Sequence, residues 1–220
     1  MKAPLNVLVV DIGGTNVKIL ASGQTERRRF PSGKTMTPRK MVAGVAKLAK
    51  DWEYDVVALG YPGPVRAGRP AAEPHNLAKG WVGFDFRVAF CCPVKIVNDA
   101  AMQALGSYRR GTMLFLGLGT GLGSALVIPG GIVVPLELAH LAYGKKTYED
   151  YLGARGLERL GREKWQKRVE TITERFVSAL LLDDVVIGGG NAKKLTRLPQ
   201  GCRMGDNANA FRGGFQLWQK

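Results

Sequence analysis

The chain has 220 residues, which is enough for one larger domain or for two small lobes with a buried core. Apolar residues make up 45% of it and the mean hydropathy is −0.06, so the composition is that of a soluble globular protein. Its three cysteines include no CxxC pair, which excludes a zinc site or redox couple of that kind, while the net charge of +14 leaves DNA, RNA, an anionic membrane and polyphosphate open as partners.

An apolar run at residues 6–10 predicts a central strand near the start of the chain. A single lysine precedes this run, which soon reaches Asp11 and shows no signal-peptide cleavage pattern. We therefore expect a cytoplasmic protein.

A glycine turn, DIGGTNVK, follows this strand and leads into a second apolar run. The N–H groups of Gly13 and Gly14 and the hydroxyl of Thr15 are suited to phosphate oxygens, and Lys18 adds a cation. Asp11 is suited to hold Mg²⁺ through water. The turn is not a P-loop, because GxxxxGK[ST] is absent, and it lacks GxGxxG, which disfavours a dinucleotide fold.

After a helix predicted from Pro38, a strand at residues 56–59 ends in a tight loop at 60–64. Loops in this position commonly contact ligands in α/β sheets. Residues 66–85 are rich in Gly, Pro and Ala, and we expect them to be a surface excursion in which Asn76 caps a turn or contacts a ligand.

A buried strand at residues 93–97 is followed by Asn98 and Asp99 and then by a helix over 100–108. An aspartate at such a junction often serves only as the N-cap of the helix. The functional alternative makes Asp99 a general base.

The stretch from residue 111 to 136 carries no charge, yet its alternating glycines and its prolines argue against a transmembrane helix. Residues 113–116 and 124–128 are predicted strands, joined by a turn that contains Gly119, Thr120 and Gly121. This hairpin either binds phosphate or only packs tightly. Glu137 and His140 follow it as candidate ligands of a polar substrate.

The last third of the chain predicts helices over 148–160, 164–182 and 207–218, with a strand at 184–187. Residues 196–206 are expected to form turns. The strand runs into Gly188, Gly189 and Gly190, which would let the chain approach a flat ligand such as adenine.

The two glycine turns resemble each other, DIGGTNVKIL against GLGTGLGSAL, which predicts a duplicated α/β lobe. We place the N-terminal lobe at 1–110 and the C-terminal lobe at 111–220, and leave open whether the last helix packs back on the first lobe. Two such turns facing each other would bind a phosphate chain from both sides of a cleft.

Together, these motifs resemble the ROK family of sugar kinases within the actin-like ATPase superfamily, most of all its polyphosphate glucokinase branch. The matching pieces stand in family order and span nearly the whole chain: DIGGTNVK at 11–18, GYPGPV at 60–65, NLAKGWVGFD at 76–85, VNDA at 97–100, LGTGLGSAL at 118–126, ELAHL at 137–141, YEDY at 148–151 and VIGGG at 186–190. Each piece alone is weakly specific, whereas the ordered set is strong. The resemblance implies a two-lobed actin-like ATPase (ribonuclease H-like) fold with a duplicated α/β domain and a central cleft.

The resemblance also implies a role for each matching residue. Asp99 would be the catalytic base for the 6-hydroxyl of the sugar, and Asp11 would lie at the Mg²⁺–phosphate assembly. Besides Asp99, the sugar-binding residues would be Gly63, Asn76, Asn98, Glu137, His140 and Glu149. The phosphate-binding residues would be Gly13, Gly14, Thr15, Lys18, Gly119, Thr120 and Gly121, and the nucleotide-side residues Gly188, Gly189 and Gly190.

The implied activity is transfer of a phosphoryl group from polyphosphate, ATP or both to the 6-hydroxyl of glucose or a close hexose such as mannose, with Mg²⁺ as cofactor. We expect no zinc, because residues 141–146 contain none of the cysteines that usually follow the family's histidine. His140 would then not be a zinc ligand, and its segment would be held by packing alone. The chain is shorter than most relatives, mainly in its second half, which leaves the choice of donor open.

Two alternatives have no kinase activity: a sugar-binding regulator and a silent sugar-binding protein. Regulators of the family place a helix-turn-helix ahead of the sugar domain, whereas the first strand here begins near residue 6. We therefore expect no nucleic-acid partner and no membrane partner, and we leave a homodimer open.

Overall fold

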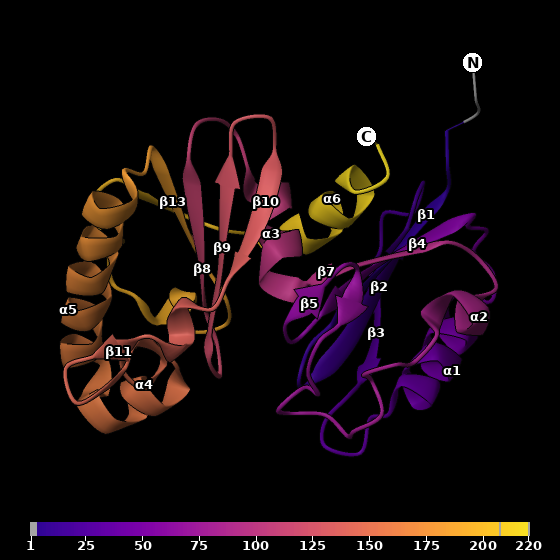
Figure 1. Cartoon of the computed structure of the whole chain (residues 1–220), viewed down its shortest axis with the longest axis horizontal. Helices are drawn as coiled ribbons and strands as arrows, with labels where there is room; N and C mark the ends of the chain where they lie inside the picture. The colour runs from indigo at the N-terminus through magenta and orange to yellow at the C-terminus, as the bar shows by residue number, and fades with distance from the viewer. Residues whose placement is uncertain (1–3, 207, 220) are drawn as a thin grey trace. The chain divides into compact units, whose positions relative to one another are not determined.

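The computed structural model describes residues 4–206 and 208–219, and the chain divides into two compact units. The first unit comprises the described residues up to Met102 together with those from Ala210 onward, and the second runs from Gln103 to Asn209. Each unit is built on its own five-stranded sheet (Figure 1).

The sheet of the first unit has the strand order β3-β2-β1-β4-β7. β1 pairs antiparallel with β2 and parallel with β4, which in turn pairs parallel with β7. The strands are β1 Val7–Ile12, β2 Asn16–Ala21, β3 Arg28–Pro31, β4 Val56–Tyr61 and β7 Val94–Asn98. β1 and β4 are buried along their whole length, as central strands with both faces covered should be.

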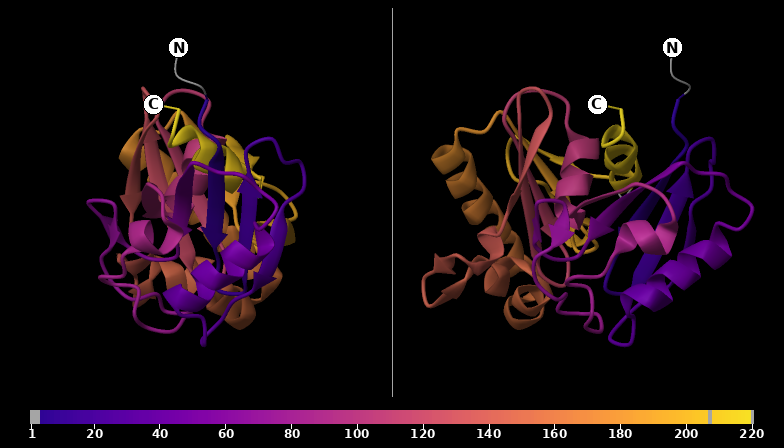
Figure 2. Two further views of the ribbon diagram at one scale, coloured as in Figure 1. Left: turned by 90° about the vertical axis from the view of Figure 1, so that its right-hand side faces the viewer. Right: turned by 45° about the vertical axis from the view of Figure 1, so that its right-hand side comes forward.

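Helices cover both faces of this first sheet (Figure 2). α1 (Pro38–Leu48) and α2 (Phe86–Phe90) pack with Leu8, Val10 and Ile12, which point to one face of β1. α3 (Asp99–Ser107) and α6 (Asn209–Gln216) pack with Val7 and Val9 on the opposite face. Successive residues of a strand point to opposite faces, so both sets come from one apolar run.

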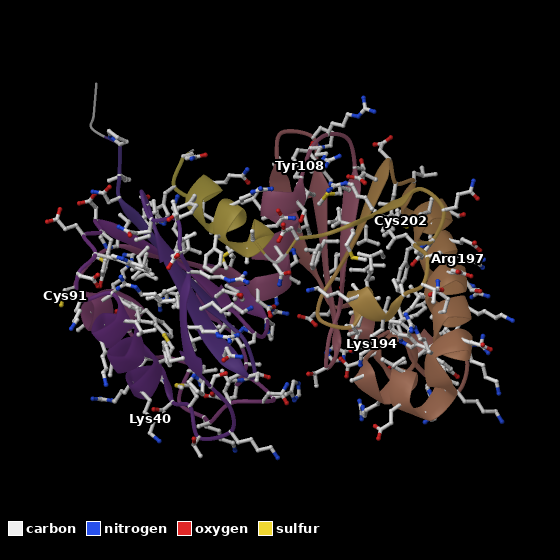
Figure 3. The ribbon with its side chains drawn as sticks, turned by 180° about the vertical axis from the view of Figure 1, so that it is seen from behind. Lys40, Cys91, Tyr108, Lys194, Arg197 and Cys202 are labelled. Atoms are coloured by element: carbon white, nitrogen blue, oxygen red, sulfur yellow. The ribbon has the colours of Figure 1, made fainter. Side chains whose placement is uncertain are left out.

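The sheet of the second unit has the order β10-β9-β8-β13-β14. Its strands are β8 Met113–Leu118, β9 Leu122–Ile128, β10 Ile132–Leu136, β13 Asp184–Gly188 and β14 Cys202–Met204. α4 (Tyr148–Leu152) and the long α5 (Ala154–Leu180) cover one face, where Trp165 and Phe176 are buried. Arg197 forms an ion pair with Glu170 of α5 at 2.9 Å and lies beside that helix (Figure 3).

The two sheets share one strand order, which confirms the predicted duplication. Asp11 pairs with Lys18 on the neighbouring antiparallel strand and with Gly60 on the parallel one. At the matching position of the second sheet, Gly117 pairs with Gly123 and Gly188. The backbone is therefore repeated, whereas the acid and the cation occur only in the first copy.

The expectation that residues 66–85 form a surface excursion is wrong for Leu77 and Trp81, which are buried, although most residues around them are exposed. Trp81 is fully buried, its ring lies 5.8 Å from that of Tyr61, and its indole N–H donates to the carbonyl of Ala78 at 2.7 Å. Leu77 is also buried against the first core. The short strands β5 (Val65–Arg66) and β6 (Arg69–Pro70) open this segment, which forms part of the core.

Other elements of the structure also differ from those predicted from the sequence. The sequence pattern missed the edge strands β3 and β10, and β14 lies where only turns were expected. The helices predicted over 148–160 and 164–182 are instead α4 and α5, which meet at Gly153, and α5 bends at Gly161 where φ is 72°. Residue 207, the predicted start of the last helix, lies outside the described residues.

The uncharged stretch contains β8, β9 and β10, and no helix. In the described part of the chain, no helix is long and apolar enough to cross a membrane.

Candidate active site

The carboxyl ends of β1, β4 and β7 bring several predicted residues to one edge of the first sheet. Asp11 lies opposite Gly60, and Asn98 lies opposite Tyr61, one position further along β4. A Cβ on Gly60 would lie 3.6 Å from the Cα of Asp99, so the missing side chain lets α3 begin close to the sheet. Since neighbouring strands are about 4.8 Å apart, the backbones of Asp11 and Asp99 lie about 10 Å apart along this edge.

Asp11 is a buried carboxylate, 6% exposed, and its Oδ2 accepts a hydrogen bond from Lys18 Nζ at 3.2 Å. A carboxylate has about four acceptor sites, so this pair leaves capacity for water bound to a metal ion. Among the described residues, no three His, Cys, Asp or Glu side chains gather as metal ligands. The donor set fits Mg²⁺ held through water, since this ion commonly keeps several waters and shares one or two carboxylates with substrate phosphates.

The first turn (residues 13–15) is held by Ser32, which follows β3. The Ser32 hydroxyl donates to the carbonyl of Gly13 at 2.6 Å, and the backbone N–H of Ser32 donates to the carbonyl of Thr15 at 2.9 Å. In a trans peptide the N–H points opposite to the carbonyl, so the N–H of Gly14 faces away from Ser32. The N–H of Gly13 closes the turn on Asn16 at 3.0 Å.

The second turn (residues 119–121) is held in the same manner. The carbonyl of Gly119 accepts from the Asn191 side-chain amide at 2.8 Å and from the N–H of Ala154 at 3.1 Å. The carbonyl of Thr120 also accepts from Ala154 at 3.1 Å. The N–H groups of Thr120 and Gly121 therefore face away from the start of α5.

The N–H groups of Thr120 and Gly121 thus face outward in the second turn, and that of Gly14 faces outward in the first. Within the described residues, the N–H groups of Gly14, Thr15, Thr120 and Gly121 donate to no protein acceptor. Gly119 resembles Gly13, since its N–H is used inside its own turn. Both threonine side chains are exposed. Paired outward N–H groups of this kind form an anion-binding concavity.

Two amides lie close to the predicted base and the first turn. Asn98, rather than Asp99, caps α3, because its Oδ1 accepts from the N–H of Ala101 at 3.1 Å. The Asn98 Nδ2 donates to the carbonyl of Gly63 at 3.1 Å, which fixes the loop after β4 to the start of the helix. Asn76 lies against the first turn, since a Cβ on Gly14 would be 3.2 Å from its Cβ.

Asp99 begins α3 and is partly buried, and its Oδ1 accepts from the N–H of Ala100 at 2.8 Å. Because Asn98 supplies the cap, capping does not account for the acid at position 99.

Glu149, a predicted sugar ligand in α4, braces the second hairpin. Its Oε2 accepts from the N–H of Leu122 at 3.3 Å, directly after the turn, and its Oε1 accepts from Arg155 at 3.3 Å. A Cβ on Gly121 would collide with the Glu149 carboxylate, so only glycine fits there without a shift.

Glu137 and His140 are exposed: Glu137 precedes the short 3₁₀ segment η1 (Leu138–His140) and His140 ends it, with 3.6 Å between Glu137 Oε2 and His140 Nε2. The expectation that packing alone holds this segment is wrong. The hydroxyl of Ser124 on β9 donates to the carbonyl of Leu136 at 2.8 Å and accepts from the N–H of Leu138 at 3.2 Å.

The three glycines after β13 differ in their surroundings. A Cβ on Gly188 would lie 2.7 Å from the Phe115 ring, and Gly189 has a φ of 84° and abuts the carbonyl of Leu118. Only Gly190 has open space around it. Two of the three are therefore explained by packing on β8, and the helix that follows is only the 3₁₀ segment η2 (Ala192–Lys194).

The ROK family model matches residues 7–134, which is more than half of the chain. The chain belongs to the ROK family.

Two comparisons place it among relatives. A polyphosphate glucokinase of Mycobacterium tuberculosis is 27% identical over 208 residues, 84% of this chain and 77% of the relative. Polyphosphate glucokinase of Mycobacterium leprae is 26% identical over 211 residues, 86% of this chain and 64% of the relative.

Solved structures show the same fold. An inorganic polyphosphate/ATP-glucomannokinase from Arthrobacter sp. strain KM has a TM-score of 0.83 at 24% identity, with 98% of each chain covered. A ROK family glucokinase from Streptomyces griseus, in complex with glucose and AMPPNP, has a TM-score of 0.77 at 16% identity, with 97% of this chain and 99% of that chain covered. These likenesses confirm the predicted fold class.

The ROK motifs located both turns but not the residues that orient them. Ser32, Ser124 and Asn191 each form hydrogen bonds with backbone groups far away in sequence, and no local pattern reveals such partners. The repeat of the two turns is the one sequence signal that points to such partners. Both copies need some residue that binds the backbone carbonyls of the turn.

Proposed function

We propose that this ROK protein is a sugar kinase that transfers a phosphoryl group from polyphosphate or ATP to the 6-hydroxyl of glucose or a close hexose such as mannose. The observation that carries this proposal is the pair of equivalent turns, of which only the first has an adjacent buried acid. Each turn has two N–H groups that donate to no acceptor within the described residues. Phosphoryl transfer depends mostly on positioning and charge stabilisation, and these groups supply both.

In this proposal the N–H groups of Gly14, Thr15, Thr120 and Gly121 bind phosphate oxygens of the donor. Asp11 would hold Mg²⁺ through water, and the ion would neutralise phosphate charge. Lys18 fixes the direction of the Asp11 carboxylate, because its Nζ donates to Asp11 Oδ2 at 3.2 Å.

Asp99 accepts the proton of the attacking hydroxyl. It stands at the same sheet edge as Asp11, about 10 Å away by strand spacing, which leaves room for a hydroxyl and a phosphoryl group between them. Asn76, beside the first turn, offers both a donor and an acceptor to a sugar hydroxyl. In the second unit, Glu137 and His140 are exposed and offer polar groups of the same kind.

Asn98 and Glu149 have a supporting role besides any contact with sugar. Both ends of the Asn98 amide bond to the protein, and both carboxylate oxygens of Glu149 have protein donors. We infer that these side chains position the Gly63 loop and the second turn, respectively.

The net charge of +14 and the names of the relatives favour polyphosphate among the donors, with ATP as a second donor. One coupled assay tests this function: glucose, mannose and fructose, each with ATP and with polyphosphate in the presence of Mg²⁺. Phosphorylation of glucose by either donor supports the proposal. Sugar binding without phosphorylation of any hexose by either donor contradicts it and leaves a silent sugar-binding protein.

A further inference from the structure

A basic hollow of about 620 Å³ lies in the first unit, and no residue of either turn lines it. Its walls are the β5–β6 pair, the start of α2 and the outer side of β7. β7 is the last strand of its sheet, so one row of its backbone groups is not paired within the sheet. Three cations line the hollow: Arg69, Arg87 and Lys95.

The charges in this hollow are not balanced. Arg69 and Arg87 are exposed, and within the described residues neither guanidinium group forms a hydrogen bond or an ion pair. Lys95 is held in place by the carbonyl of Leu217 at 2.6 Å, a neutral partner. The only acid in the lining is Asp85, whose carboxylate caps α2 by accepting from the N–H of Val88 at 3.0 Å.

A second hollow, of about 480 Å³ in the second unit, has a smaller net charge than the basic hollow. It is lined by Arg109, Arg110 and Arg203 but also by Asp183 and Asp184. Arg203 forms an ion pair with Asp184 at 2.7 Å. Three cations therefore face two acids there, and the net charge is smaller than in the basic hollow.

The basic hollow suits a phosphate chain. Guanidinium groups bind phosphate oxygens through two parallel N–H donors, and the volume accommodates several phosphate groups. Val97 of the lining is followed by Asn98 at the end of β7, and Asp99 then begins α3. The lining of the hollow therefore comes within two residues of the proposed base along the chain.

We propose that the basic hollow is a second phosphate-binding site, which holds the part of a polyphosphate chain remote from the phosphoryl group being transferred. The identity of the chain as donor rests on the proposed function, whereas its binding to the hollow does not. Besides the phosphate being transferred, tripolyphosphate and ATP each have only two phosphates, so neither can place several phosphates in the hollow while it reacts.

The test is the double variant Arg69→Ala/Arg87→Ala, assayed with long-chain polyphosphate, tripolyphosphate and ATP. We expect the KM for long-chain polyphosphate to rise about tenfold or more, since two charge-assisted contacts are lost. The KM values for tripolyphosphate, ATP and glucose should stay unchanged. The pair Arg109→Ala/Arg110→Ala removes the same charge from the other hollow and should leave all four values unchanged, and Arg69→Lys/Arg87→Lys should restore part of the loss.

Calorimetric titration with long-chain polyphosphate, at several salt concentrations, separates this proposal from the kinase assignment. The Ala/Ala variant should bind more weakly, and the slope of log Kd against log salt should fall by about two, one for each lost phosphate contact. Equal binding by the variant and the wild type, or an equal loss in the Arg109/Arg110 control, overturns the second site. If no donor supports phosphorylation but the titration changes as expected, the second site stands and the kinase function fails.

Discussion

The side-chain amide of Asn191 lies 2.8 Å from the carbonyl oxygen of Gly119 and sets the direction of the peptide that follows. Replacing it in Asn191→Ala removes this donor, so the N–H of Thr120 is held outward only through the contact of the Gly119 carbonyl with the N–H of Ala154. We expect the KM for the phosphoryl donor to rise about tenfold, the value of one lost hydrogen bond of about 1.4 kcal/mol. The KM for glucose in the same variant is the internal control, and an equal rise in both constants would show general loosening instead.

Thr120 contributes an exposed hydroxyl at the centre of the second turn. Thr120→Val keeps the shape of the side chain and removes the hydroxyl. Steady-state kinetics should show a larger loss in donor affinity than in sugar affinity. Equal losses for donor and sugar would contradict the assignment of this turn to phosphate.

The ion pair between the buried Asp11 and the half-buried Lys18 predicts a dependence on Mg²⁺. Asp11→Asn removes the negative charge that would hold the hydrated ion, while the amide keeps the size of the side chain. We expect the Mg²⁺ concentration that gives half-maximal activity to rise, with glucose binding by calorimetry unchanged. An unaltered Mg²⁺ titration would place the ion elsewhere.

Trp81 predicts a stability effect, because it is fully buried against Tyr61 and Phe86. Trp81→Ala should lower the free energy of unfolding by about 3 to 5 kcal/mol, measured by urea denaturation. Val82→Ala is the matched control, since Val82 is 48% exposed, and it should change that free energy by less than about 0.5 kcal/mol. A small effect at Trp81 would mean that the segment is not part of the core.

The sequence pattern predicted the central strands well because they are continuous apolar runs between glycine turns. β1 and β4 were each found within two residues of their ends. The edge strands were missed for a physical reason: β3 consists largely of arginines and an aromatic, and β10 has a proline and exposed apolar residues, so neither shows the alternation of a half-buried strand.

The burial of Trp81 also could not be predicted from a local sequence pattern. The segment around it is rich in Gly, Pro and Ala, a composition typical of loops, and its burial depends on contacts with residues of the distant first core.

In the candidate site, too, local motifs could be read from the sequence, whereas contacts between distant residues could not. The positions of Asp11 and of the two turns could be predicted because local motifs mark them, whereas their roles in binding stay predictions. The roles of Asn98 and Glu149 could not, because each depends on which backbone group the folded chain places beside it. The relatives' motif assigns Glu149 to sugar, whereas its hydrogen bond to Leu122 adds a role in holding the turn.

Asp99→Asn tests the central claim most directly, since it removes the proposed base while keeping its size. Turnover of glucose should be measured with ATP and with polyphosphate, alongside glucose binding by calorimetry. We predict that kcat falls by a factor of about 10² to 10⁴ with both donors while the Kd for glucose stays within a few-fold of the wild type. Near-wild-type turnover with either donor would contradict the assignment of Asp99 as the base that activates the sugar hydroxyl.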